Sequence, residues 1–317
     1  MRQAGPTLAA IVITLALADA ASAAPGYDWA FPGKGAKDTN APKGDPWIGL
    51  PGSSVRYRAS VIHDGAVAID WRPREHAPLP AVLARAKPPS QYACGYCHLP
   101  DGEGRPENAS LAGLPADYIR RQIAAFASGE RTGVRPDWGP TAGMIGIARS
   151  TSAADVAAAA AYFSKRRFVS HLKVVETAAA PATVARAFVE ARVPGRPAPL
   201  APDRIVEGPV SMDRFELRDS HVGYIAYVPR GAIARGAALA RSGGPAGQAC
   251  AACHGAAFQG SVGPPLAGRS PTYVVRQLLA FKAGSRRSPA AAPMIPVAAA
   301  LSQAQMVDLA AYAASLR

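Results

Sequence analysis

The chain has 317 residues, enough for about two domains, and 49% of them are hydrophobic, enough for a packed core. The net charge is +13, and the lysines and arginines are scattered rather than gathered in basic tracts. No nucleic-acid motif is apparent, so binding to nucleic acid is not expected. The basic surface is interpreted either as generally solvated or as a face that docks an acidic protein.

The N-terminal residues 1–23 predict a secretory signal peptide. A positive Arg2 precedes an apolar run at 8–18, and Ala-Ser-Ala at 21–23 matches a cleavage site before Ala24. The apolar run is too short for a comfortable membrane span, and no other stretch is long enough. We therefore expect an exported, periplasmic protein that does not span a membrane after signal cleavage.

An internal repeat determines the predicted architecture. Leu-Ala-Gly at 111–113 returns at 266–268, and Tyr-x3-Gln-x3-Phe at 118–126 returns at 273–281, both at an offset of 155 residues. One fold is therefore present twice in the chain. The expected divisions are a signal peptide at 1–23, an irregular segment at 24–77, a first domain at 78–167, a linker or insert at 168–229 and a second domain at 230–317.

Each copy predicts three helices around a loop-rich crevice. The first is short, the second carries the Tyr-Gln-Phe pattern, and the third is rich in alanine, so that it can cross the first closely. Ser270-Pro271 suits the start of the second helix of the second copy. The third helices begin with capping boxes, Ser152 with Asp155 and Ser302 with Gln305.

The segments outside the copies predict little regular structure. Short strands are predicted at 61–62, 66–69, 214–217 and 222–228, and residues 178–202 are expected to be partly helix-like and partly linker. The insert is interpreted as a small β element between the domains or as a partner-docking module. Three of the four tryptophans lie in the irregular N-terminal segment, which suggests that it packs against the rest of the chain: Trp29, Trp47 and Trp71.

The motif Cys-x-x-Cys-His occurs once in each copy, at 94–98 and 250–254, and uses all four cysteines. It attaches c-type haem, because two thiols at this spacing reach one porphyrin edge while the following histidine lies beneath the iron. A disulfide or half of a zinc site is the alternative, but zinc needs further ligands and no other cysteine exists. We expect two covalent haem c groups held by Cys94, Cys97, Cys250 and Cys253, with His98 and His254 as axial ligands.

The second axial ligand of a haem decides between electron transfer and catalysis. Met144 and Met294 occupy equivalent repeat positions, each in a Gly- or Pro-bearing loop between the second and third expected helices. A thioether binds Fe(II) well and raises the reduction potential. Both are therefore predicted axial ligands, with two core methionines as the alternative. Met306 is expected in the core, and Met212 has no repeat partner.

The proximal histidine needs an acceptor for its other ring nitrogen. The Pro264 carbonyl offers one, and Ala109 falls at the matching position of the first copy, in a loop one residue longer. We therefore expect the two haems to be tuned differently. The remaining histidines have no repeat partner and are interpreted as surface or packing residues: His63, His76, His171 and His221.

These motifs, together with the Pro-x-Leu-Ala-Gly turn at 264–268 and the tyrosines of the last helices, resemble class I cytochromes c. In tandem they resemble dihaem cytochrome c4. The resemblance covers about residues 78–165 and 230–317. It implies a mainly α-helical fold, with each haem held by two Cys, His and Met and with the two haem domains facing each other. It also implies one-electron transfer between redox proteins, such as a dehydrogenase donor and an oxidase or cytochrome acceptor.

Three functions are consistent with these residues. The leading hypothesis is a soluble dihaem carrier that is not an enzyme, because six-coordinate irons leave no open site. A dihaem peroxidase would need an iron without its methionine, foremost Met144, and a thiosulfate dehydrogenase with a cysteine ligand would need a fifth cysteine. The third hypothesis is an electron-accepting subunit of a periplasmic dehydrogenase complex, with 24–77 and 168–229 as interface.

Overall fold

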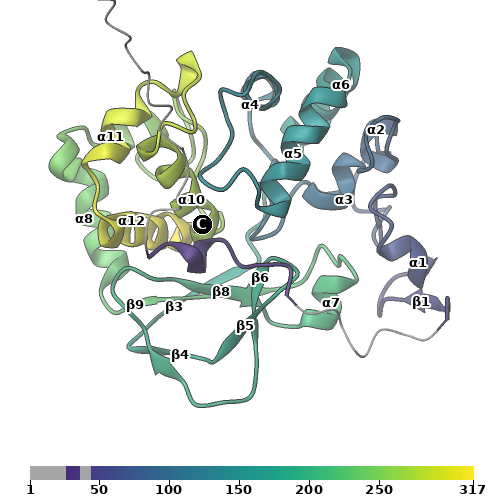
Figure 1. The fold of residues 1–317 in the computed structure, drawn as a ribbon, viewed down its shortest axis with the longest axis horizontal. Coiled ribbons are helices and arrows are strands. Elements are labelled where there is room, and N and C mark those ends of the chain that lie inside the picture. The colour runs from purple at the N-terminus through teal and green to yellow at the C-terminus, as the bar shows by residue number, and fades with distance from the viewer. Residues whose placement is uncertain (1–25, 36–43) are drawn as a thin grey trace, which may run out of the picture.

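The computed structural model describes residues 26–35 and 44–317, so the predicted signal peptide lies outside the described residues. The two repeat copies form helical bundles that lie side by side, and the strands of the insert lie along one side of them (Figure 1). The chain is mainly helical with a partly β insert, as the sequence predicts.

The first copy has five helices among its described residues rather than the expected three. Met144 lies inside one of the additional helices, because Pro140 in its first turn suits a helix start rather than a loop. The Ser152 cap is confirmed, since its hydroxyl accepts a hydrogen bond from the Asp155 N–H at 3.1 Å. The helices are α2 (Ala81–Ala84), α3 (Cys94–His98), α4 (Ala116–Ser128), α5 (Gly139–Ser150) and α6 (Ala153–Ser164).

The second copy repeats this order with a longer first helix. The caps predicted from Ser270 and Ser302 are both present, and the Ser302–Gln305 box makes both of its hydrogen bonds. Its helices are α8 (Ala232–Ser242), α9 (Cys250–His254), α10 (Pro271–Lys282), α11 (Met294–Ala300) and α12 (Gln303–Ser315), with 3-10 turns η2 (Gly244–Ala246) and η3 (Pro289–Ala291).

Helices α8 and α12 cross closely at Gly236. A Cβ at this position would lie 2.0 Å from the Asp308 carbonyl oxygen and 2.8 Å from the Tyr312 Cβ, so only glycine allows the approach. The Asp308 carboxylate accepts two hydrogen bonds from Arg235 across the same crossing, at 2.8 and 2.9 Å. The predicted close crossing is confirmed for this copy, although a glycine and not an alanine forms the closest point.

The insert contains a three-stranded sheet in the order β3-β9-β8, with β3 parallel and β8 antiparallel to β9. The strand predicted at 222–228 is confirmed as β9. The strand predicted at 214–217 is wrong, because Ser211 caps helix α7 (Met212–Glu216) there. The helix-like expectation for 178–202 is also wrong. The strands are β3 (Leu172–Thr177), β4 (Ala179–Ala180), β5 (Thr183–Arg186), β6 (Val189–Arg192), β7 (Ala198–Pro199), β8 (Val206–Pro209) and β9 (Tyr224–Pro229).

The N-terminal segment packs against the insert and both copies. Trp71 is 3% exposed, and its indole N–H donates to the Leu217 carbonyl at 2.6 Å. The strand predicted at 61–62 is wrong, because these residues end a short helix, and 66–69 contributes only a single bridge, Val67 to Arg85. The described elements are η1 (Asp28–Ala30), β1 (Trp47–Gly49), β2 (Arg56–Arg58) and α1 (Ala59–Ile62).

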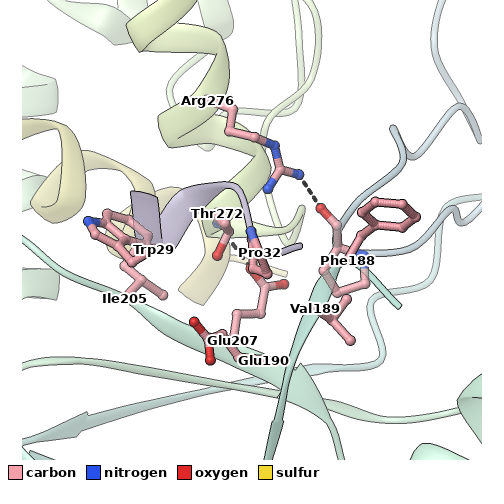
Figure 2. Close-up of a pocket in the computed structure, with 10 residues that line it drawn as sticks. Trp29, Pro32, Phe188, Val189, Glu190, Ile205, Glu207, Thr272 and Arg276 are labelled. Carbon is pink, nitrogen blue, oxygen red and sulfur yellow. Dashed lines mark hydrogen bonds between the residues drawn. The ribbon is translucent and has the colours of Figure 1, made fainter. Parts of the chain in front are cut away.

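Buried arginines of the second copy connect it to the rest of the chain. Arg276 on α10, labelled in Figure 2, donates to the carbonyl of Ala30, at 2.8 Å, and to that of Pro106 in the first copy. Arg269 reaches two further first-copy carbonyls, those of Ser110 and Ala112, at 2.8 and 2.9 Å. The junction is therefore fixed by directed hydrogen bonds, which specify one relative placement of the copies.

The largest hydrophobic core belongs to the second copy and includes Met306, as expected, together with parts of η1 and the sheet. The first copy has a smaller, separate core around Leu83 and Phe163. Within residues 26–35 and 44–317, no single helix is long and apolar enough to cross a membrane. Helices α11 and α12 meet that criterion only jointly, as a pair bent by 118°.

Candidate functional site

Both Cys-x-x-Cys-His motifs fold as single-turn helices, α3 and α9, which begin at the first cysteine and end at the histidine. All four thiols are free and half-buried. Burial raises the pKa of Cys94 to about 12 and also raises the pKa of Cys97 and Cys250. A zinc site needs further ligands, and no cluster of three ligating side chains occurs in the described part of the chain. The zinc alternative is therefore disfavoured.

The two histidines have matching hydrogen bonds. His98 Nδ1 lies 2.8 Å from the Ala109 carbonyl oxygen, and His254 Nδ1 lies 2.8 Å from the Pro264 carbonyl oxygen. The predicted acceptors are thus confirmed in both copies. The extra residue of the first loop is taken up by a turn in which Arg105 and Asn108 bond to each other. Because Nδ1–H donates to the carbonyl, Nε2 is the nitrogen free to bind iron.

The electrostatic surroundings keep both imidazoles neutral. Burial lowers the pKa of His98 and of His254, and the hydrogen bond to the carbonyl opposes that shift only in part. A metal-ligating histidine must be neutral, so the site favours the ligating form without a neighbouring base. The donor set therefore fits a haem iron on the proximal side.

The two methionines lie on corresponding helices and not in loops. Met144 lies in the middle of α5, and Met294 is the first residue of α11; both side chains are half-buried. Helix α5 packs on α4, and α11 packs on α10, so each methionine follows the Tyr-Gln-Phe helix of its own copy. A helix rather than a loop therefore carries each thioether.

A cluster of six polar side chains at the junction of the copies was not predicted. Arg131 donates to Gln122 at 2.8 Å and to Gln277 at 2.7 Å, while Arg286 donates to the same two residues at 2.8 and 3.1 Å. Each arginine also reaches the tyrosine of the other copy, Tyr273 or Tyr118. The sequence does contain a sign of this cluster, because Arg131 and Arg286 keep the 155-residue offset of the repeat.

Neither of these arginines has a carboxylate partner among the described residues. Arg131 and Arg286 are 7% and 6% exposed, and each guanidinium stacks on a phenylalanine of its own copy, at 4.4 and 4.5 Å. Burial, with Arg286 alongside, lowers the pKa of Arg131. Two adjacent buried cations without an anion are costly, so the junction is suited to receive negative charge.

The other histidines have surface or packing roles, as expected. His63 is exposed, and the remaining three each lie against one carboxylate: His76 against Asp70, His171 against Glu103 and His221 against Glu75.

Comparison with known proteins agrees with this site. Residues 233–317 match the family model for cytochrome c. Over 239 residues the chain is 30% identical to a thiosulfate dehydrogenase electron acceptor of Thiomonas intermedia (strain K12), an alignment that covers 73% of this chain and 81% of that protein.

Two solved structures are also similar. Thiosulfate dehydrogenase (TsdBA) of Marichromatium purpuratum has a TM-score of 0.45 and 27% identity over 71% of this chain, which spans 37% of that longer protein. Cytochrome c4 of Acidithiobacillus ferrooxidans has a TM-score of 0.45 and 23% identity over 70% of this chain and 98% of its own.

The two haem-attachment motifs, the matched histidine contacts and the sequence relatives agree with one another. The chain belongs to the c-type cytochromes and is an electron-transfer protein with two covalently bound haem c groups.

Proposed function

We propose that this protein is an exported, soluble periplasmic carrier that passes single electrons through two His/Met-ligated haems and catalyses no reaction of its own. In this proposal the domains are residues 78–167 and 230–317. The haem attachment residues are Cys94, Cys97, Cys250 and Cys253, and the axial ligands are His98 with Met144 and His254 with Met294.

One observation carries the proposal. Each copy holds a histidine, half-buried His98 or buried His254, by the same 2.8 Å contact to a backbone carbonyl and places a methionine on a following helix. The haem supplies one-electron chemistry when bound. The chain fixes the imidazole tautomer through Ala109 and Pro264, and its two helices hold the thioethers in place. Such a rigid ligand set needs little rearrangement when the charge of the site changes by one.

The arginine pair supports two haem domains that act together. Bound haems would bring carboxylates, which are the kind of anion that Arg131 and Arg286 lack, and the two arginines would hold such carboxylates at the junction. Negative charge there would remove the repulsion between the two guanidiniums.

The partners we propose are redox proteins with acidic docking faces, because the chain carries a net charge of +13. The relative from Thiomonas intermedia is described as an electron acceptor of thiosulfate dehydrogenase, so such an enzyme is the electron donor that we propose. The same relative favours a second candidate, a haem subunit held in a complex with its dehydrogenase. Co-purification with a large catalytic subunit would distinguish the subunit from the free carrier.

The decisive experiment is the optical spectrum of the exported holoprotein, oxidised and reduced, before and after addition of carbon monoxide and peroxide. A carrier gives two low-spin haems per chain, methionine–iron absorption and no response to either reagent. A high-spin fraction, or one haem that binds carbon monoxide readily, would refute the proposed ligand set and favour an enzyme.

A further inference from the structure

The two haem-attachment helices differ in what covers them. In the first copy α3 is buried beneath the N-terminal segment and the insert. A Cβ on Gly95 would lie 2.9 Å from the Ala68 Cβ, and Tyr96 is 7% exposed. The guanidinium of Arg218, next to α7 of the insert, stacks 3.2 Å from the Tyr96 ring and donates to its carbonyl at 2.8 Å.

The loop that follows α3 is covered in the same way. Arg105 is 7% exposed and Glu107 is 6% exposed, and the two form an ion pair at 3.1 Å. Arg105 also stacks on Phe215 of α7 at 3.6 Å and donates to its carbonyl. The insert therefore closes the attachment side of the first haem site to other proteins.

The corresponding side of the second copy, around α9, is exposed. Val262, in the loop after α9, is 90% exposed, whereas the corresponding loop of the first copy holds the buried Arg105 and Glu107. Figure 1 shows α7 below the first copy and α11 at the upper left of the second, away from the strands of the insert. Turn η2, which lies just before α9, packs against α11. Exposed small apolar residues from these segments form what we call the haem-2 face: Ala252, Ala256, Ala257, Val262, Pro296 and Ala299.

The haem-2 face has a distinct charge pattern. No Asp, Glu, Lys or Arg occurs in 243–268 or in 288–307, the two stretches that supply the face. Exposed cations directly precede these stretches, namely Arg241, Lys282 and Arg287. Asp308 is the only acidic residue in 230–317, and Arg235 neutralises it. The face therefore has an uncharged apolar centre, and the charged residues that its own copy places beside it are basic.

We propose that the haem-2 face is the docking surface for the redox partner, and that this partner presents an apolar centre surrounded by acidic side chains. In each encounter the partner loses one electron and this chain gains one, or the reverse, and no bond or proton moves. The inference rests on the proposed function and deepens it, because it assigns electron exchange with partners to the second haem site. The first haem site would then exchange electrons only with the second, inside the protein.

The exposed side chains favour a protein over a membrane as the occupant. They are four alanines, one proline and one valine, and these short side chains let a partner's redox centre approach closely. Segments that bind membrane surfaces instead insert Trp, Phe or Leu, and the face has none of these. Its basic rim matches an acidic protein and would raise the rate of encounter.

The test compares two valine-to-glutamate variants of the full-length holoprotein, Val262→Glu and Val184→Glu. Val184 is the matched control, because it is 50% exposed on β5 of the insert, away from the haem-2 face. Electron transfer from reduced thiosulfate dehydrogenase is followed by stopped-flow absorbance. We expect the second-order rate constant to fall about tenfold or more for Val262→Glu and less than about twofold for the control, with unchanged spectra.

Equal rate constants for the two variants would overturn the proposal. If the wild type takes no electrons from thiosulfate dehydrogenase, the proposed donor is wrong. The rate constants of the same two variants are then compared with flavodoxin hydroquinone, an acidic one-electron donor, in place of the enzyme. Binding of the wild type but not of Val262→Glu to phosphatidylglycerol vesicles, with unaltered rate constants, would assign the face to a membrane and also overturn the proposal.

Discussion

Arg131 and Arg286, at equivalent positions of the two copies, each donate hydrogen bonds to both Gln122 and Gln277. The backbones also pair here, since Arg131 and Arg286 form an antiparallel bridge and the Thr132 N–H donates to the Ser285 carbonyl at 2.8 Å. An approximate two-fold relationship between the copies is thus built into their contact. A change at either arginine should affect both copies.

Replacement of Arg131 by glutamine should weaken the junction. The shorter side chain removes one of the two arginine donors from each half-buried glutamine oxygen and the arginine donor of the Tyr273 hydroxyl, so we expect a loss of about 1–3 kcal/mol in the free energy of unfolding. Urea unfolding of the holoprotein measures it. Arg121→Gln is the control, because Arg121 is exposed on α4 and should change stability by about 0.5 kcal/mol at most. Equal losses for both variants would contradict a role of Arg131 at the junction.

Replacement of either Met144 or Met294 by alanine should remove one methionine–iron bond. Each variant should lose about half of the methionine–iron absorption and gain a haem that binds carbon monoxide, with a lowered reduction potential at that haem. Spectroelectrochemistry follows both effects. Met212→Ala is the control, since Met212 lies on α7 of the insert and has no equivalent in the repeat. A full band in Met144→Ala would assign another ligand to the first haem.

The repeat predicts the two copies, and the Cys-x-x-Cys-His motifs with the loops that follow them predict the histidine acceptors, because each of these is a short local pattern. The placement of the methionines was less predictable. The sequence predicts a Gly- or Pro-bearing loop around Met144, yet a proline in the first turn, here Pro140, fixes the backbone angle that a helix needs. The same residue types that break a helix in its interior start one at its N-terminus.

Long-range pairing explains most other differences. Strand β3 was not predicted, because its partner β9 lies about fifty residues later and the local sequence gives no turn signal. The strand predicted at 214–217 gave way to α7, where the Ser211 cap outweighs the alternation of apolar residues. The cover over the first attachment helix depends on contacts such as Arg218 with Tyr96, which no local pattern reveals.

The stability of the protein should fall between about pH 4 and pH 7 because of Asp101. Burial raises the pKa of Asp101 from 3.8 to about 7, so the folded chain binds more protons than the unfolded chain in this range. A carboxyl whose pKa is raised on folding contributes stability below pH 3.8 and loses it as the pH rises through 7. His171, whose pKa is raised by its bond to Glu103, acts in the same direction.

Asp101→Asn tests this pH dependence. Asparagine keeps an oxygen for the Glu103 N–H, which bonds to Asp101 at 2.9 Å, but it carries no charge. We expect the variant to exceed the wild type in unfolding free energy by roughly 2 kcal/mol at pH 8 and to match it near pH 4. Asp64→Asn, at an exposed carboxyl, is the control and should show no such difference. A constant offset at all pH values would indicate a packing effect instead.

Replacement of Gly236 by alanine should separate helices α8 and α12. The new Cβ would meet the Asp308 carbonyl oxygen at 2.0 Å, and neither backbone can yield without disturbing the Arg235–Asp308 ion pair. We expect a loss of about 3 kcal/mol or more, because overpacking of a core displaces its neighbours. For Gly146→Ala, also within a helix, we expect the opposite change in stability, because no neighbouring atom lies within 4 Å of the added Cβ. It should raise the melting temperature slightly, by the gain of about 0.5–1 kcal/mol that alanine gives over glycine in a helix. If both variants melted above the wild type, the close crossing of α8 and α12 would be refuted.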